Sequence, residues 1–247
     1  MTTLIEKLLY FKKKIKLAHR FIKPFPFDTN ILTTKDKKSL KETVNGFDRT
    51  ILLKELIKQR AKGVYDNTEL NFWVINKWGG IKTFKKTPKN IEKISVFEKQ
   101  LIKKKLTKDT FGTISSLSKI PSFIDPDNFV IYDSKVIFTL NWLILTTDSQ
   151  GLKFFPMPTG RNKILVDFDM NTIIHLTHLK QYQNKEEIFI NHQDAYFTFC
   201  DLMKKLSFKV FGSNAKPYLI ELLLFTISDK EIFAELKEMT RVKLNCG

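Results

Sequence analysis

Apolar residues recur along most of this 247-residue chain at spacings of three and four positions, which is the period of one helix face. The first such stretch, residues 1–17, places Leu4, Leu8 and Phe11 on one face and lysines around them, and it predicts a basic amphipathic helix. Alternation of period two, typical of half-buried strands, is almost absent. The pattern therefore predicts a mainly α fold of about eight to ten helices.

Start and stop signals divide this pattern into elements. The predicted helices are residues 40–62 with a break where Asp48 caps a second helix, residues 69–78 before Gly79-Gly80, a helix from Thr87-Pro88 to Leu101, a helix after Asp133, a helix over residues 195–206 after a capping box of Asn184 and Glu187, a helix after Pro217, and a last helix capped by Asp229. Residues 107–119 are predicted to form one short helix or a hairpin. Residues 148–163 are a predicted loop, and residues 164–168 a short extended piece.

One stretch, residues 115–142, organises the chain. A polar segment carries Lys119, and a Pro/Asp/Asn turn follows at residues 125–128. Asp133 stands directly before the apolar helix pattern, where a helix N-cap belongs. A carboxylate at this position lies at the positive end of the helix dipole, which favours its ionised form.

The segment Ile131-Tyr132-Asp133-Ser134-Lys135-Val136, with a lysine upstream, resembles the core of the helix-hairpin-helix (HhH-GPD) base-excision DNA glycosylases. The resemblance implies that Asp133 is catalytic and that Lys119 is the nucleophile of a bifunctional enzyme. The chain departs from the family at residues 115–118, where Ser-Ser-Leu-Ser replaces a glycine-containing hairpin. The separation of 14 residues (133 − 119) is also shorter than in the family.

The same resemblance implies the architecture, a single two-lobed all-helical domain over residues 1–247. Residues 48–145 form one lobe, and residues 1–47 with 146–247 form the other. The active site is then expected in the cleft between the lobes.

Charge and cysteine content narrow the choice of partner. A formal net charge of +16 and a pI of about 9.7 indicate an acidic polymer, with nucleic acid first and a membrane surface second. An AT-rich coding bias is an alternative reason for the many lysines. The two cysteines, Cys200 and Cys246, form no metal-binding motif, and the first helix lacks an apolar run long enough for a signal peptide or a membrane span. We therefore expect a cytoplasmic monomer, nucleoid-associated when bound to DNA, without metal or cofactor.

Cleavage of an N-glycosidic bond builds positive charge on the sugar, and a fixed carboxylate such as Asp133 stabilises that charge. A lysine attacks C1′ only as a neutral amine, so its pKa must fall. Ile120, Pro121 and Phe123 flank Lys119 and are expected to desolvate it, and Lys135 is a candidate neighbouring cation.

Residues that hold DNA and a flipped base are sought among serines near Lys119, aromatic residues and a polar loop cluster. The candidates are Ser116, Ser118, Tyr132, Lys135, Trp142, Phe154, Phe155, Arg161, Asn162 and Lys163. Trp78 is a further aromatic candidate. Since the chain has 22 phenylalanines, core packing is the alternative role of each aromatic residue, and a solvated turn is the alternative for the loop cluster.

Three functions compete on this sequence. The first is a DNA glycosylase, with or without lyase activity, that removes damaged or modified bases. The second is a non-catalytic DNA-binding protein on the same scaffold, and the third is a basic protein that binds a membrane or an acidic protein through its first helix. A metal-dependent nuclease is disfavoured, because Asp167 with Asp169, and His175 with His178, have no further acidic or histidine partners nearby.

Overall fold

The computed structural model describes residues 1–17, 32–62, 67–147, 149, 151–159, 168–178 and 187–239. Within these ranges the chain is mainly helical and has no strand, since the β-type pairing there is an isolated parallel bridge between Phe154 and Phe189. The predicted fold class is confirmed at this level. The helices are α1 (Thr2–Lys14), α3 (Thr34–Glu42), α4 (Gly46–Ala61), α5 (Thr68–Phe72), the π-helix η1 (Trp73–Trp78), α6 (Pro88–Lys103), α7 (Lys108–Phe111), α8 (Ile114–Leu117), α9 (Lys119–Ile124), α10 (Ser134–Thr146), α11 (Met170–Thr177), α13 (His192–Phe211), α14 (Tyr218–Ile227), the π-helix η2 (Ser228–Ile232) and α15 (Phe233–Met239).

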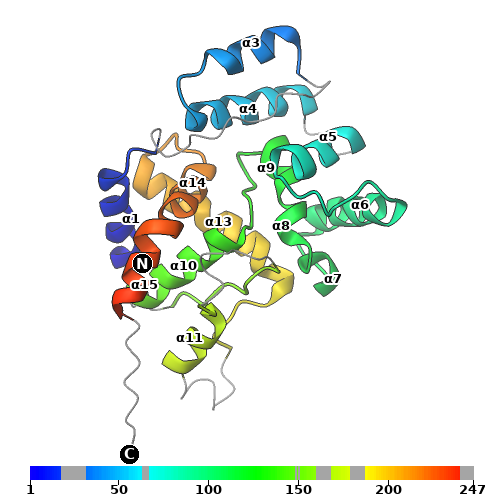
Figure 1. The fold of residues 1–247 in the computed structure, drawn as a ribbon. Helices are drawn as coiled ribbons and strands as arrows, with labels where there is room; N and C mark the ends of the chain where they lie inside the picture. Colours follow the sequence, from blue (N-terminus) through cyan, green and yellow to red (C-terminus); the bar gives the residue numbers. More distant parts are fainter. Residues whose placement is uncertain are drawn as a thin grey trace, which may run out of the picture.

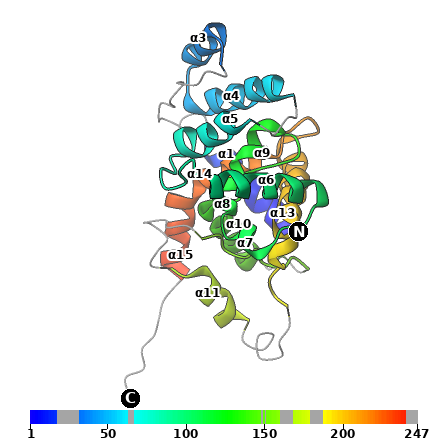
Figure 2. The same cartoon turned by 90° about the vertical axis from the view of Figure 1, so that its right-hand side faces the viewer.

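The helices pack in two neighbouring groups (Figures 1 and 2). In one, α4 packs on α9 and α3, and α9 also contacts η1 and α8. In the other, α14 packs on both α10 and α13, while α1 lies against α13. The two predicted lobes, residues 48–145 and residues 1–47 with 146–247, stay a prediction. Helix α10 lies almost wholly within residues 48–145, yet it contacts α14, η2 and α1, which belong to the other predicted lobe.

Several helix starts follow the sequence signals. Thr87 caps α6 with its side chain, and Pro88 occupies the first helical position, where no intrahelical hydrogen bond is lost. A break does separate two helices before Asp48, but Asn45 makes the cap and accepts a 2.9 Å hydrogen bond from the N–H of Asp48. The predicted capping role of Asp48 is therefore wrong, because Asp48 lies inside the first turn of α4.

Two later caps also differ from expectation. Helix α13 begins at His192, with Asn191 accepting a 3.0 Å hydrogen bond from the N–H of Gln193. Asn184 of the predicted capping box lies outside the described residues. Asp229 caps no helix, because the chain continues from α14 through η2 into α15 and Asp229 lies within η2.

A continuous apolar core joins the helices, and its largest fully buried side chains include Phe11, Phe97, Tyr132, Phe138 and Tyr196. In the part of the chain that the structure describes, no helix is both long enough and apolar enough to cross a bilayer.

The segment that leads to Asp133 is set by local chemistry. All six residues of α9 are buried, and Pro121 is tolerated there because it lies in the first turn, whose N–H groups have no intrahelical partner. Asp125 ends α9, and its carboxylate accepts a 2.9 Å hydrogen bond from the Asn128 side chain in the predicted turn. The chain then runs without helix to Asp133 and enters α10.

Candidate active site around Lys119 and Asp133

A buried hydrogen bond ties the two halves of the candidate site together. The backbone N–H of Tyr132 donates to Oγ of Ser118 at 3.0 Å, and both residues are fully buried. Ser118 directly precedes Lys119, and Tyr132 directly precedes Asp133. The structure thereby brings the two predicted catalytic residues together, and the charge of Asp133 acts on the Lys119 amine.

Lys119 is a buried lysine with 6% of its surface exposed. Its amine donates a hydrogen bond to the backbone carbonyl of Ser115, one turn earlier. Burial lowers the pKa of Lys119, and the nearby carboxylates of Asp133 and Glu221 oppose that shift. The desolvation expected from the flanking apolar residues is therefore confirmed, and it favours the neutral amine that a nucleophile needs.

Asp133 is the N-cap of α10, as predicted from its position. Its Oδ1 accepts a 2.8 Å hydrogen bond from the N–H of Lys135, and its backbone carbonyl accepts the first helical bond from Ile137 at 2.9 Å. The side chain is half-buried, in contrast to its buried neighbour Tyr132. A carboxylate at a helix N-terminus with partial access to solvent is placed to meet a charged ligand atom.

Lys54 is a charged residue of the site that the sequence analysis missed. It lies on α4, has no exposed surface, and donates to the carbonyl of Ser122 at 2.9 Å. Its amine also lies 4.5 Å from the centroid of the Phe123 ring. Burial lowers the pKa of Lys54 to about 8, and the carboxylate of Glu221 opposes the shift.

Glu221 is the second residue that was missed. It is buried in α14, and its Oε2 accepts a 3.0 Å hydrogen bond from the N–H of Ile131, two residues before Asp133. Burial raises the pKa of Glu221, while Lys54 and the Ile131 N–H oppose the shift. The sequence does contain a signal for both residues, because each is a single charged residue on the apolar face of a helix. A single buried charge needs a partner, so such a residue points to an interaction elsewhere in the chain.

Lys135 does not supply the cation expected beside Lys119. Its amine forms an ion pair with Asp229 of η2 and lies 5.0 Å from the centroid of the Phe225 ring. The backbone N–H of Lys135, not its charge, serves the site by binding Asp133. The expectation that Lys135 is the cation near Lys119 is therefore wrong. The buried cation of this region is Lys54, which the sequence analysis did not identify.

The aromatic candidates for a flipped base belong to the core. Tyr132, Trp142, Phe154 and Phe155 are all buried. The Tyr132 hydroxyl donates to the carbonyl of Pro156 at 2.8 Å, which explains how a polar group is accommodated there. The structure assigns them the alternative role of core packing in place of the predicted contact with a base, because all four belong to the continuous apolar core.

Trp78 is the aromatic candidate that lies beside the charged residues of the candidate site, Lys54 among them. It is half-buried, its ring meets Phe123 edge-on at 4.7 Å between centroids, and the Lys54 amine lies 6.0 Å from its centroid. Ser116 is half-buried on α8, whereas Ser118 is fully buried and serves the hydrogen bond to Tyr132.

The remaining residues singled out in the sequence analysis lie away from this site or outside the described residues. Arg161, Asn162, Lys163 and Asp167 lie outside the described residues. Asp169 is the N-cap of α11, where its carboxylate accepts hydrogen bonds from Asn171 and Thr172. The rings of His175 and His178 pack against Phe189 and Phe154, at 5.4 and 5.2 Å between centroids. Across the described ranges, no three His, Cys, Asp or Glu side chains converge as metal ligands.

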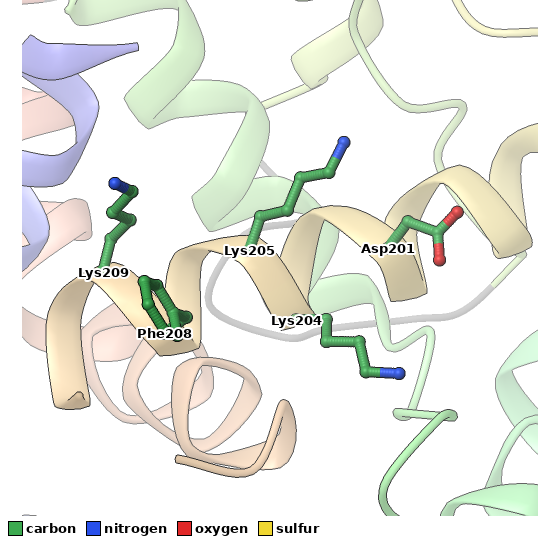
Figure 3. A pocket seen from close by; sticks show the side chains of 5 residues that line it. All are labelled: Asp201, Lys204, Lys205, Phe208 and Lys209. Carbon is green, nitrogen blue, oxygen red and sulfur yellow. The ribbon is translucent and has the colours of Figure 1, made fainter. Parts of the chain in front are cut away.

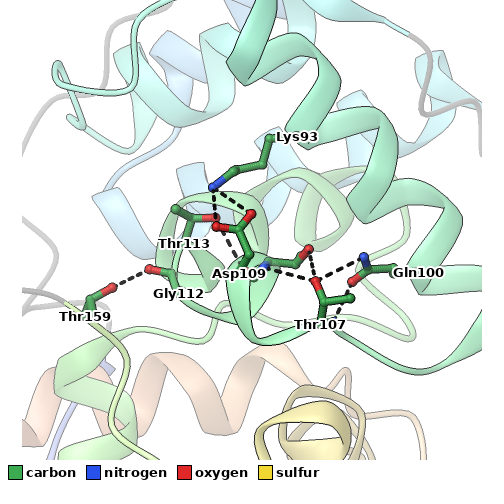
Figure 4. Close-up of polar contacts among 8 residues, drawn as sticks. Lys93, Gln100, Thr107, Asp109, Gly112, Thr113 and Thr159 are labelled. Carbon is green, nitrogen blue, oxygen red and sulfur yellow. Dashed lines mark hydrogen bonds and ion pairs between the residues drawn. The ribbon is translucent and has the colours of Figure 1, made fainter.

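Polar contacts set the hairpin that precedes α9 (Figure 4). Residues 107–119 form two four-residue helices, α7 and α8, joined at residues 112–113. Lys93 of α6 pairs with Asp109 of α7 at 3.2 Å, and Gln100 of α6 accepts a 3.0 Å hydrogen bond from the N–H of Thr107. The Thr159 hydroxyl donates to the carbonyl of Gly112, which ties the loop after α10 to the hairpin.

A surface hollow lies on α13 (Figure 3). It is lined by Asp201, Lys204, Lys205, Phe208 and Lys209, all of which are exposed. Its three lysines outnumber its one carboxylate, so this face is positively charged. A second hollow lies between α5 and α6, and neither hollow includes Lys119 or Asp133.

No protein-family model, curated protein or solved structure was found to match this chain. The likeness to helix-hairpin-helix glycosylases therefore stays an interpretation of residues 115–142 and of the geometry around Lys119.

Proposed function

We propose that the protein is a DNA N-glycosylase that removes a damaged or modified base. The observation that supports it most is the placement of a buried lysine, Lys119, near a half-buried carboxylate, Asp133, which caps the start of a helix and whose charge acts on the lysine amine. Buried lysines are rare, because burial disfavours the charged form. Desolvation that lowers the pKa of a lysine is one of the ways in which an amine nucleophile is activated.

In the proposed reaction the neutral Lys119 amine attacks C1′ of the target nucleotide. The C1′–N bond breaks, and the base leaves with the bonding electrons and takes up a proton. Positive charge develops on the sugar during this step, and the Asp133 carboxylate stabilises it. Loss of a proton from the amine and opening of the sugar ring then give a Schiff base, from which β-elimination cuts the strand.

Binding to DNA is supported by charge. The formal net charge of +16 favours a polyanion, and the exposed lysines of α13 illustrate how that charge is displayed (Figure 3). Phosphate contacts would position the duplex without reading its sequence. In a cell this binding would place the protein on the nucleoid.

A non-catalytic DNA-binding protein is the second candidate, and one observation favours it. The four aromatic residues proposed to hold a flipped base are buried in the core. Base flipping needs a pocket that accepts the base, so burial of these residues favours a protein that binds DNA without flipping a base. Trp78, which is half-buried next to Lys54, is the remaining aromatic candidate for holding a base in the glycosylase.

Duplex DNA carrying deaminated, oxidised, alkylated or otherwise modified bases separates the two candidates. The protein is incubated with each substrate, and abasic sites are counted. A glycosylase forms abasic sites with at least one substrate. Salt-sensitive binding to all of them without base release would establish the non-catalytic protein.

A further inference from the structure

The exposed face of α13 carries charge that the fold itself does not use. Asp201, Lys204, Lys205, Phe208 and Lys209 lie three and four positions apart and form one solvent-facing stripe along the helix (Figure 3). The opposite face of α13 is buried in the core. Three lysines and one carboxylate leave the stripe with a net positive charge.

Two of these lysines have no charged partner in the protein. Asp201 lies one turn before Lys205, yet no ion pair joins them, and neither Lys205 nor Lys209 pairs with a carboxylate of the described residues. The Lys209 amine lies 5.8 Å from the centroid of the Phe208 ring. Like charges four residues apart on a helix repel each other, so Lys205 and Lys209 together disfavour α13. Stability of the helix therefore does not explain them, and an anion outside the protein does.

A hydrogen bond ties this face to the segment that holds the candidate site. The Lys204 amine donates to Oδ1 of Asn128 at 2.7 Å. Asn128 belongs to the turn between α9, which begins at Lys119, and α10, which Asp133 caps. The basic face of α13 thus adjoins the turn that connects the two halves of the candidate site.

Two further lysines extend the positive surface around that turn. Lys216 lies alongside α13, because its carbonyl accepts a 2.6 Å hydrogen bond from the Ser207 hydroxyl. Its amine pairs with Asp127 at 2.7 Å, and Lys58 of α4 pairs with the same carboxylate at 2.5 Å. Two amines share one carboxylate here, so the turn adds to the net positive charge of the surface.

We propose that the α13 face, formed by Lys204, Lys205, Phe208 and Lys209, binds the sugar-phosphate backbone of DNA beside the candidate site. The choice of DNA as the partner rests on the proposed function. A helix rises 1.5 Å per residue, so residues 201–209 extend over about 12 Å. One strand of B-DNA carries a phosphate about every 3.4 Å along its axis, so this length matches roughly three phosphates.

A membrane surface fits the same stripe less well. A helix that binds a membrane inserts an apolar face, and the apolar face of α13 is occupied by the core. Phe208, which is 53% exposed, is the one large apolar side chain that α13 offers to solvent. A single ring among lysines is suited to contact a base or a sugar between phosphates.

The test measures binding of a fluorescent duplex without modified bases over a series of salt concentrations. The variant Lys205→Glu/Lys209→Glu reverses two charges and keeps the bond between Lys204 and Asn128. It should bind more weakly, and the slope of log affinity against log salt concentration should become shallower by about two, since each phosphate contact contributes about one. Thermal melting close to the wild type checks that the variant is folded.

Lys35→Glu/Lys41→Glu is the matched control, because it changes the net charge equally on two exposed lysines of α3, away from α13 (Figures 1 and 2). It should keep the wild-type slope. Equal losses in the two variants would show that only the total charge counts, and an unchanged α13 variant would exclude this face. Either result would overturn the proposal.

Removal of the carboxylate tests the same face in the opposite direction. Asp201→Asn should strengthen binding by about two- to threefold, the size of one charge interaction in water, whereas Glu42→Gln on α3 should not. Vesicles of phosphatidylserine and phosphatidylcholine complete the test. Binding to these vesicles that the α13 variant loses, without binding to DNA, would assign the face to a membrane and overturn the proposal.

These measurements need no base release. If the wild type releases no base but the α13 variant alone loses DNA binding, the proposed glycosylase is wrong and the DNA-binding face stands. If the wild type releases base and the α13 variant binds DNA as the wild type does, the proposed function stands and this inference is wrong.

Discussion

Gly79 lies directly against the aliphatic stem of Lys119. A Cβ atom placed on Gly79 would be 2.7 Å from Cδ and 2.8 Å from Cε of Lys119, and 2.7 Å from the carbonyl oxygen of Ile75. The lysine stem therefore occupies the space that any larger residue at position 79 would fill. The Gly79-Gly80 pair, read from the sequence as a helix stop, also leaves room for the buried amine.

Gly79→Ala is expected to displace Lys119 and to lower the free energy of unfolding by about 1–3 kcal/mol, the usual cost of overpacking. The Ile75 carbonyl is backbone and cannot move aside cheaply. Chemical denaturation measures the change. Gly112→Ala is the control, because its Cβ would meet its nearest atom at 3.3 Å, and it should cost much less. Equal costs for the two variants would show that the contact with Lys119 is loose.

Stability should rise with pH in a narrow range because of Lys54. Its pKa is about 8 in the folded protein and 10.5 when unperturbed, so the unfolded chain binds more protons between these values. The contribution of Lys54 to the free energy of unfolding therefore grows as pH rises, by about 1 kcal/mol from pH 8 to 9. Denaturation of the wild type at pH 7, 8 and 9 measures it.

Lys54→Met should lose this rise, whereas Lys58→Met should keep it. Measurements stop at pH 9, because Cys200 and Tyr218, whose pKa values are raised from 9.0 and 10.0 to about 12, bind more protons in the folded state and lower the stability as pH rises further. The effect of Cys200 begins below pH 9, but it is present in both proteins, so the difference between wild type and Lys54→Met isolates Lys54. The same pH dependence in wild type and Lys54→Met would show that Lys54 is not perturbed as described.

The sequence predicted those features that depend on neighbours in the chain. Asp133 as a cap, Thr87-Pro88 as a helix start and the desolvation of Lys119 all follow from nearby residues, and all are confirmed. Lys54 and Glu221 were missed because their roles depend on residues 68 and 90 positions away, as the bonds of Lys54 to Ser122 and of Glu221 to Ile131 show.

The same limit explains the errors. Lys135 was assigned to Lys119 from proximity in sequence, yet it pairs with Asp229, 94 residues later. The aromatic residues near Asp133 were available for a base pocket by composition, but tertiary packing buries them. Asn45 and Asp48 are both residue types that cap helices, and the backbone geometry at the start of α4 decides that Asn45 is the cap.

The lyase step predicts a covalent intermediate. Borohydride should trap an adduct between the protein and DNA that contains its target base, because reduction fixes the Schiff base on Lys119. Lys119→Gln should abolish the adduct, and Lys135→Gln, which removes a neighbouring amine paired with Asp229, should retain it. Base release without an adduct in the wild type would make water the nucleophile. An adduct that survives Lys119→Gln would move the nucleophile to another amine.

Binding to duplex DNA should weaken steeply with salt. Each phosphate neutralised by a lysine or arginine contributes about −0.9 to the slope of log affinity against log salt concentration. Replacing Lys204, Lys205 and Lys209 with Gln should reduce the slope if DNA covers the α13 face, while Lys54→Met should leave it unchanged because Lys54 is buried. A flat salt response of the wild type would exclude nucleic acid as the main partner.

The most direct test compares two identical substitutions at two helix N-caps. Asn can replace Asp as a cap at little cost, so Asp133→Asn and Asp169→Asn should both melt close to the wild type. Abasic sites are then counted on the modified-base substrate that the wild type cleaves. The account predicts that Asp133→Asn loses base release by about 10²–10³-fold while Asp169→Asn remains active. Full activity of Asp133→Asn, or no base release by the wild type on any substrate, would contradict it.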